Sequence, residues 1–351
     1  MEVRASDPGT RLLESFLFYQ LPLFLAGAFF LPESRYKQTK ITASGKDMSA
    51  HASKKVIYAA LVGNFLIALT KSAAAAYTNS SAMMSEAIHS IVDCGNQGLL
   101  LYGIKKAKKP ADKAHPFGYG MELYFWTFVV AILIFAVGAG VSLYEGVIKV
   151  ISPHPVTDIY INYIVLGIAV IFEGAAWFIA YKEFRASQSE PGLLNSILKS
   201  KDPTIFTVLF EDTAALLGLL VALGGLFVGD LLNIPEFDGL ASIVIGLILA
   251  GTAILLAYES KGLLLGEAAS EDVVRIIEEI VTAKKDITAI NETLTMHMGP
   301  QDVLLNLSLN FKDDISAAEV EKAVSDMERE IKSRLPEVKR IFIEAQSEEA
   351  Q

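Results

Sequence analysis

Ionisable and amide side chains interrupt one of the hydrophobic stretches of the chain, residues 81–104. Glu86, His89, Asp93 and Asn96 follow one another there at spacings of three, four and three residues. On an α-helix these spacings place all four side chains on one face. An ionisable side chain at the centre of a bilayer costs several kcal/mol, by a contested amount. Such a row therefore needs a functional or structural reason.

Two later hydrophobic stretches also carry acids, Glu173 in the fourth and Glu211 with Asp212 in the fifth. The sequence shows no evident lysine or arginine at membrane depth that would neutralise them. Lys71 lies near the end of the first stretch, and we expect its side chain to extend toward the lipid headgroups. A cluster of carboxylates with one imidazole and no fixed countercharge is most readily compensated by a bound cation.

The residue types indicate which cation. Imidazole nitrogen and carboxylate oxygen suit Zn²⁺, Mn²⁺, Co²⁺ or Fe²⁺, whereas Ca²⁺ and Mg²⁺ prefer oxygen ligands alone. His89 and Asp93 can both face one ion, and Asp212 on a facing helix is a third candidate ligand. Glu211 or Glu173 can complete a tetrahedral site. The accessory candidates are Glu173 and Glu86.

A transport site must also release its cargo. Metal ligands have to be deprotonated, so protons compete with the metal for them. His89 is the natural exchanging group, since imidazole titrates near neutral pH. We therefore expect metal–proton antiport.

Other interpretations remain open. His89 and Asp93 can instead form a buried hydrogen-bonded pair that ties helices together, or a proton relay that binds no metal. A membrane-anchored metal sensor or scaffold is a further class. We do not expect an enzyme, because an intramembrane metallohydrolase would carry a His-Glu-x-x-His pair and the sequence has none. A channel is expected to have weak, repeated sites along a pore, whereas these ligands concentrate at one level.

The elements that position these residues are hydrophobic stretches long enough to cross a bilayer, which takes roughly 20 residues of helix. The chain is 52% hydrophobic and 20% charged, fewer charges than a soluble protein usually has. We expect a six-helix transmembrane bundle, with spans at 56–77, 81–104, 122–148, 159–181, 204–228 and 238–258. In the sixth span Gly239, Ser242, Gly246 and Ala250 recur at helical spacing, which indicates a packing seam.

Charge predicts the orientation of these spans. The links 78–80, 149–158 and 229–237 contain a single lysine, Lys149, while the opposite links are rich in lysine and arginine. This asymmetry predicts that both termini lie on the cytoplasmic side or its topological equivalent. Basic residues placed beside membrane spans give no support for nucleic-acid binding. The single cysteine, Cys94, excludes an intramolecular disulfide.

The pattern changes after the last span. Residues 303–311 alternate apolar and polar side chains, which predicts a strand with one buried face. Ser316 with Glu319 predicts a capping box at the start of a helix. We therefore expect an αββαβ unit, an α+β cytoplasmic domain of ferredoxin-like type at 261–346, after a transmembrane domain at 54–260.

Residues 1–47 form an N-terminal extension of uncertain nature. The stretch 16–31 is hydrophobic but short, with Gln20 and Pro22 inside it. A signal peptide and an extra partial helix are both open interpretations. The change of character at Met48 also motivates the hypothesis that translation begins there.

Several segments together resemble the cation diffusion facilitator family of zinc and manganese exporters. The stretch Ser85–Asp93 is similar to the family's metal motif, with His89 and Asp93 at its two ligand positions. His115–Glu122 is similar to the approach to the family's third span, and Asp238–Gly246 to its sixth. The resemblance implies a homodimer, held partly by the cytoplasmic domains, whose protomers alternate between inward-open and outward-open states.

The chain departs from the family pattern in two places. Val208 occupies the first position of the usual second ligand pair and cannot bind metal, whereas Asp212 fits the second position. Glu211 is the evident substitute, and Phe210–Thr213 is similar to a branch that includes mitochondrial zinc exporters. The link 182–203 contains no histidine, and His297 is the only histidine of the soluble domain. We therefore expect the regulatory zinc sites of some relatives to be absent or changed.

The sequence thus predicts a proton-coupled exporter of divalent metal. Zn²⁺ is the expected cargo, and Mn²⁺, Fe²⁺ and Co²⁺ are the alternatives. Its partners are the lipid bilayer, protons and a second copy of the chain, and it needs no cofactor. His115, at the membrane edge, is expected either to guide metal or to stabilise a turn.

Overall fold

The computed structural model describes residues 48–187 and 203–346, and the structural statements below concern these residues. The chain divides into one unit that ends at Lys55 and a second that begins at Val56. Our interpretations of residues 1–47 fall outside the described ranges. The account below concerns the second unit, which holds every candidate site residue.

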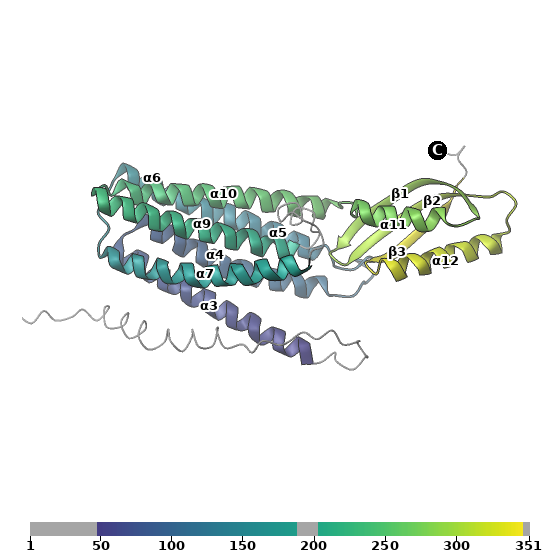
Figure 1. Ribbon diagram of the computed structural model, residues 1–351, viewed down its shortest axis with the longest axis horizontal. Helices are drawn as coiled ribbons and strands as arrows, with labels where there is room; N and C mark the ends of the chain where they lie inside the picture. Colours follow the sequence, from purple (N-terminus) through teal and green to yellow (C-terminus); the bar gives the residue numbers. More distant parts are fainter. Residues whose placement is uncertain (1–47, 188–202, 347–351) are drawn as a thin grey trace, which may run out of the picture. The chain divides into compact units, whose positions relative to one another are not determined.

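Long helices form the first part of this unit (Figure 1). Each of the six predicted spans falls on a helix or, for the third span, on a continuous run of helical segments. The helices are α3 (Met48–Thr78), α4 (Ser81–Ala107), α5 (Glu122–Leu133), η2 (Ile134–Ala139), α6 (Gly140–Ile151), α7 (Ile159–Ser187), α9 (Pro203–Leu232) and α10 (Glu236–Leu265).

Four helical segments within the described residues are long and apolar enough to cross a membrane by length and composition. They are Glu122–Ile151, Ile159–Lys182, Phe206–Leu232 and Glu236–Leu265. Helices α3 and α4 are not among them. The polar side chains of α4, Glu86, His89, Asp93 and Asn96, lower its mean hydropathy. Length and composition therefore support four of the six predicted spans.

The helix α10 is central to the packing, because it contacts α4, α5, α6 and α9. Its contact with α6 is a backbone-to-backbone approach. A Cβ on Gly146 would lie 2.7 Å from Gly239 O, and a Cβ on Gly246 would lie 2.8 Å from Leu143 Cγ. Small residues allow this approach between helices in a membrane. The predicted packing seam on the sixth span is therefore confirmed.

This seam yields a stability prediction. Gly146→Ala places a methyl group against the backbone of α10, which cannot withdraw as a flexible side chain can, so we expect a loss of about 1–3 kcal/mol. Thermal unfolding of the purified protein in detergent measures the loss. The matched control is Gly251→Ala in α10, where a Cβ would meet nothing within 4 Å. Equal midpoints for both variants would contradict the seam.

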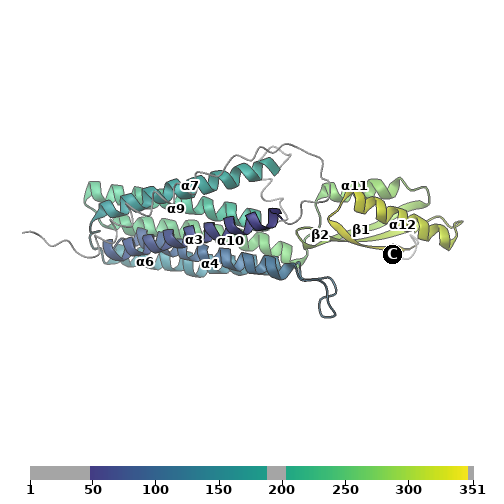
Figure 2. The same cartoon turned by 90° about the horizontal axis from the view of Figure 1, so that it is seen from below.

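The C-terminal part has its own fold and core. Its elements are α11 (Glu271–Thr282), β1 (Ile287–Gly299), β2 (Asp302–Phe311), α12 (Ala317–Arg334) and β3 (Val338–Ala345). The strand β2 is the middle strand, antiparallel to β1 and parallel to β3. Both helices lie on one face of the sheet (Figure 2). This is the predicted αββαβ order.

The alternation in the sequence explains which face the helices cover. Val303, Leu305, Leu307 and Leu309 are fully buried. They pack in one core with apolar residues of both helices: Ile277, Ile280, Val281, Met327 and Ile331. The alternation predicted for 303–311 is confirmed, with Phe311 only partly buried at the end of the strand.

The predicted capping box at the start of α12 is also present. Glu319 Oε2 accepts from the backbone N–H of Ser316 at 2.7 Å, and the Ser316 hydroxyl accepts from the Glu319 N–H at 3.4 Å. The hydrogen bond from the Ser316 backbone is the main reason that the pKa of the Glu319 carboxyl lies below its ordinary value. The helix therefore begins where two of its free N–H groups find partners.

Candidate metal site in the helix bundle

Helix α4 directs its polar row into the bundle. Glu86 and Asn96 are fully buried, and His89 is 2% exposed. The side chain of Asp93 retains 21% of its surface exposed. The four residues therefore share an inward face, as their spacing predicts.

His89 and Asp93 lie beside each other on this face. His89 Nδ1 is 3.5 Å from Asp93 Oδ1. Both ring nitrogens of His89 and Oδ1 of Asp93 are buried without a hydrogen-bond partner. Buried polar atoms in proteins nearly always have a partner, so these three atoms need an explanation such as ion binding. The alternative interpretation of a structural pair requires a contact that ties two helices together. The His89–Asp93 contact lies within α4 and does not do so.

Helix α9 brings two further acids to the same region. Asn96 Nδ2 donates to Glu211 Oε1 at 2.9 Å and so joins α4 to α9. The charge of Asp93 acts on both Glu211 and Asp212, and the charge of Glu173 acts on Asp212. Acids of α4, α7 and α9 thus lie within electrostatic range of one another, an arrangement that a cation would stabilise.

Small and hydroxyl residues of α9 set its position. A Cβ on Gly218 would collide with Glu86 Oε1, so the glycine leaves room for the Glu86 carboxylate in its present position. Thr213, which follows Asp212, accepts from Trp177 Nε1 of α7 at 3.0 Å. Our sequence analysis missed the role of both residues. Only the small size of Gly218 was a signal available in the sequence.

The described residues do not assemble the complete predicted ligand set in this conformation. Among them, no three histidine, cysteine, aspartate or glutamate side chains lie close enough together to hold a metal ion. His89 with Asp93 is a pair within contact distance, and Glu211 and Asp212 lie within electrostatic range of it. Val208 is 39% exposed and offers no ligand atom. The set of His89, Asp93, Asp212 and Glu211 stays a prediction.

Lys71 corrects two of our expectations. Its side chain is fully buried and does not extend toward headgroups. Its Nζ lies 3.1 Å from Glu86 Oε2 and 2.8 Å from Glu173 Oε1. A base at membrane depth is therefore available to two of the acids. The residue lies seven positions before Thr78, about 10 Å along the helix, and ion pairing with acids of two other helices compensates for its burial.

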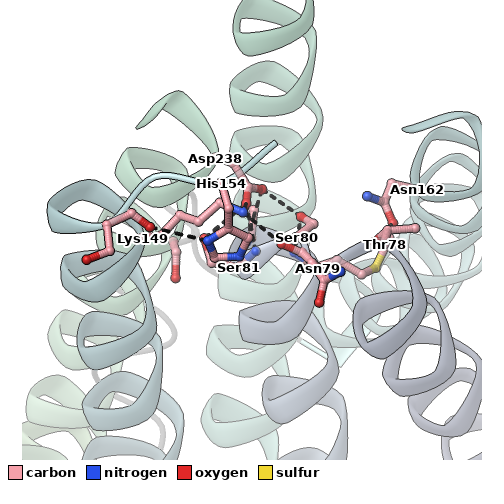
Figure 3. Close-up of polar contacts among 12 residues, drawn as sticks. Thr78, Asn79, Ser80, Ser81, Lys149, His154, Asn162 and Asp238 are labelled. Atoms are coloured by element: carbon pink, nitrogen blue, oxygen red, sulfur yellow. Dashed lines mark hydrogen bonds and ion pairs between the residues drawn. The ribbon is translucent and has the colours of Figure 1, made fainter. Parts of the chain in front are cut away.

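A second buried network holds the start of α4 in place (Figure 3). Asp238, in the first turn of α10, accepts from the Ser80 hydroxyl at 2.6 Å and from the Ser81 N–H at 2.7 Å. Lys149 Nζ lies 3.5 Å from Asp238 Oδ2 and donates to Asn79 O at 2.8 Å. The carboxylate thus caps α4 and connects it to α6 and α10. It has enough donors that no metal is needed to explain it.

This network predicts a stability effect. Asp238→Asn leaves Lys149 as a buried, unpaired charge, which typically costs about 3–5 kcal/mol. We expect a lower thermal midpoint for the purified protein. The double variant Asp238→Asn with Lys149→Met should recover part of the loss, because it removes both charges together. A double variant less stable than the single variant would show that the pair does not act as a unit.

The link after α4 holds His115 in a compact turn. The Asp112 carboxylate accepts from the Tyr119 hydroxyl at 2.8 Å and from the N–H groups of His115 at 2.8 Å and Ala114 at 2.9 Å. These hydrogen bonds hold the pKa of the Asp112 carboxyl below its ordinary value, and the bond from Tyr119 has the largest effect. The His115 ring lies 4.2 Å from the Tyr119 ring, between centroids. These contacts favour the turn-stabilising role for His115.

Cys94, which follows Asp93, faces elsewhere. It lines an apolar groove together with Phe65, Leu69 and Ile91. The 100° rotation between neighbours on a helix places it away from the polar row. It therefore serves as a control position near the candidate site.

Comparison with known proteins identifies the family. The sequence profile of the cation efflux transmembrane domain matches residues 57–265, from α3 to the end of α10. The chain belongs to the cation efflux family and is a multi-pass integral membrane protein. The prediction of a cation diffusion facilitator is confirmed.

Three relatives show where in the family the similarity is high. The chain is 32% identical over 275 residues to the mitochondrial proton-coupled zinc antiporter SLC30A9 of Xenopus laevis. The matched region covers 78% of this chain and 49% of that protein. It is 31% identical over 259 residues to the human protein of the same name, covering 73% and 46%. It is 27% identical over 261 residues to metal tolerance protein C4 of Arabidopsis thaliana, covering 74% and 57%. The chain thus spans about half the length of these relatives.

Proposed function

We propose that this protein is a secondary active transporter that exports divalent metal cations in exchange for protons. Zn²⁺ is the proposed main cargo. His89, Asp93 and Asp212 bind the metal, and Glu211 provides the fourth ligand in place of Val208. The observation that carries this proposal is the buried His89, whose two ring nitrogens lack partners while Asp93 lies at 3.5 Å. Acids of α7 and α9 lie within electrostatic range of this pair.

The ligand chemistry favours zinc. Zn²⁺ is commonly bound by imidazole and carboxylate in four-coordinate sites. The acids on α9 lie within electrostatic range of Asp93. Mn²⁺, Fe²⁺ and Co²⁺ are the alternatives, because the same ligands accept them. The relatives whose names specify a zinc antiporter support zinc and proton coupling for this chain.

Alternating access explains how such a site transports. The metal-binding groups come from α4 and α9, so a relative movement of these helices brings the ligands together or separates them. Separation of Asp212 and Glu211 from His89 and Asp93 weakens the site, and protons then replace the metal on the ligands. In the described conformation His89 and Asp93 are in contact, while the acids of α9 are not close enough to complete a site of three ligands.

The arrangement of the protein in its membrane is part of the proposal. Six spans, including α3 and the polar α4, place both termini on one side, and the basic links place that side toward the cytoplasm or its equivalent. The αββαβ domain then lies on this side, and a homodimer forms partly through it. A membrane-anchored sensor is the competing function, and it requires that His89 and Asp93 be dispensable for flux.

Metal flux into proteoliposomes tests the transport site. We expect Zn²⁺ flux in the wild type and, for His89→Ala and Asp212→Ala, a fall of at least about 10–100-fold, the effect that loss of even an indirect metal contact can have. Flux of Mn²⁺, Fe²⁺ and Co²⁺ in the same vesicles ranks the alternatives. Cys94→Ala is the matched control and keeps its flux, because its side chain faces the apolar groove. Undiminished flux in His89→Ala would favour the sensor.

Proton coupling has a separate test. In vesicles that hold the wild type, an acidic interior should accelerate Zn²⁺ uptake, because protons leave through the transporter as metal enters. Collapsing the gradient with a proton–potassium exchanger at constant membrane potential should slow the uptake. The fluorescence of a zinc-sensitive dye inside the vesicles reports both rates. Flux that is indifferent to the pH gradient would refute antiport but leave metal transport intact.

A further inference from the structure

The buried lysine of α3 is unusual because it lies among the acids of a proposed cation site. Lys71 Nζ contacts Glu86 of α4 at 3.1 Å and Glu173 of α7 at 2.8 Å. The lysine and Glu86 side chains are fully buried, and that of Glu173 is 19% exposed. Among the described residues, no other lysine or arginine forms an ion pair with an acid of the inward-facing cluster.

Each of the two carboxylates uses only one oxygen for the lysine. Glu86 Oε1 and Glu173 Oε2 are buried and have no hydrogen-bond partner. A buried pair that served stability alone is expected to have its remaining oxygens satisfied, because each unsatisfied one costs free energy. The two free oxygens are instead available to a second cation.

This group of three is electrostatically continuous with the proposed metal ligands. The charges of Glu86, Glu173 and Lys71 all act on His89. The charges of Glu173 and Lys71 also act on Asp93, and that of Glu173 acts on Asp212. An ion bound at His89 and Asp93 would therefore be repelled by the ammonium group and attracted by the carboxylates that the ammonium group holds.

We infer that Lys71 is a tethered competitor of the transported metal: it occupies Glu86 and Glu173 when the cargo is absent and thereby sets the affinity of the site. The inference rests on the proposed function and deepens it. Lys71 removes the accessory acids from the resting ligand set and leaves the cargo to His89, Asp93 and the acids of α9. When the metal leaves, the ammonium group pairs with Glu86 and Glu173 again and neutralises them.

A competitor of this kind solves a problem of release. Five carboxylates are coupled electrostatically to His89 or to one another, those of Glu86, Asp93, Glu173, Glu211 and Asp212. Without an internal cation they would bind a divalent ion strongly and release it slowly, because charges at short range interact strongly inside a protein. A resident ammonium group lowers the affinity and so favours turnover.

Zinc binding and transport by Lys71→Met test this role. Methionine is also unbranched, keeps all but the terminal atom of the lysine side chain in length, and carries no charge. Binding of Zn²⁺ to purified protein in nanodiscs, measured by competition with a chromogenic chelator, should tighten by at least about tenfold, as expected when a repelling charge is removed at close range. In proteoliposomes KM and kcat should both fall, because the metal binds more tightly and leaves more slowly. Lys71→Arg, which keeps the charge, should lie closer to the wild type.

Metal-dependent stability separates competition from a purely structural role. Without metal, Lys71→Met should have a lower thermal midpoint than the wild type, since two acids lose their countercharge. Saturating Zn²⁺ should restore the midpoint, because the metal takes the place of the ammonium group. A midpoint that stays low at saturation would assign Lys71 to structure alone and overturn the inference.

A second pair of variants decides the matter should Lys71→Met fail to fold. Lys71→Met with Glu86→Gln has the same net charge as the wild type and is compared with Glu86→Gln alone. The double variant should bind Zn²⁺ more tightly, because the metal then meets Glu173 without its ammonium partner. Equal or weaker binding would refute competition.

The outcomes also separate this inference from the proposed function. If the wild type showed no His89-dependent Zn²⁺ binding, the proposed function itself would fail. Normal binding by the wild type, without tighter binding by the variants, would refute the role of Lys71 only.

Discussion

A carboxylate in an apolar bundle is stable only if a positive charge or strong donors compensate it, and this requirement organises the whole transmembrane part. The described structure meets it in three ways. Asp238 has hydroxyl and backbone donors and Lys149, and Glu86 and Glu173 share Lys71. For Asp93 and Asp212, no lysine or arginine of the described residues lies within ion-pair distance. Under the proposed function, a bound metal ion or a proton compensates these two acids.

The three solutions suit three purposes. Asp238 has donors on both oxygens, so it fixes the start of α4 and has no reason to bind an ion. In the Lys71 group one oxygen of each carboxylate has no hydrogen-bond partner, and this is the basis for the proposed exchange of one cation for another. Among the described residues the acids beside His89 have no lysine or arginine partner. The proposed transport site requires this, because a cargo ion must be bound and then lost. A gradient from fixed to exchangeable charge thus extends along α4, from its capped beginning to Asp93.

The packing of the bundle serves the same end. The glycine seam between α6 and α10 brings their backbones together and keeps the end of α6, with Lys149, close to Asp238. Gly218 leaves room for the Glu86 carboxylate beside α9, while Thr213 and Trp177 join α9 to α7. The αββαβ domain has a separate core, which includes Leu305 and Leu307.

The sequence by itself determined the elements and the class of protein. Spacing of three and four residues was enough to place Glu86, His89 and Asp93 on one face, because helical periodicity is a local property. Alternation from Val303 to Leu309 likewise determined the buried face of β2. The family followed from short motifs that the profile match confirms.

Only the tertiary structure decided how charges pair across helices. Lys71 is 15 residues from Glu86 and 102 from Glu173 along the chain. No local pattern reports where a flexible side chain meets a distant acid, and proximity to a helix end suggested the wrong direction for it. The same limit applies to Lys149 and Asp238. Which buried acids are already neutralised, and which are left for a metal, depends on distances between helices that periodicity does not contain.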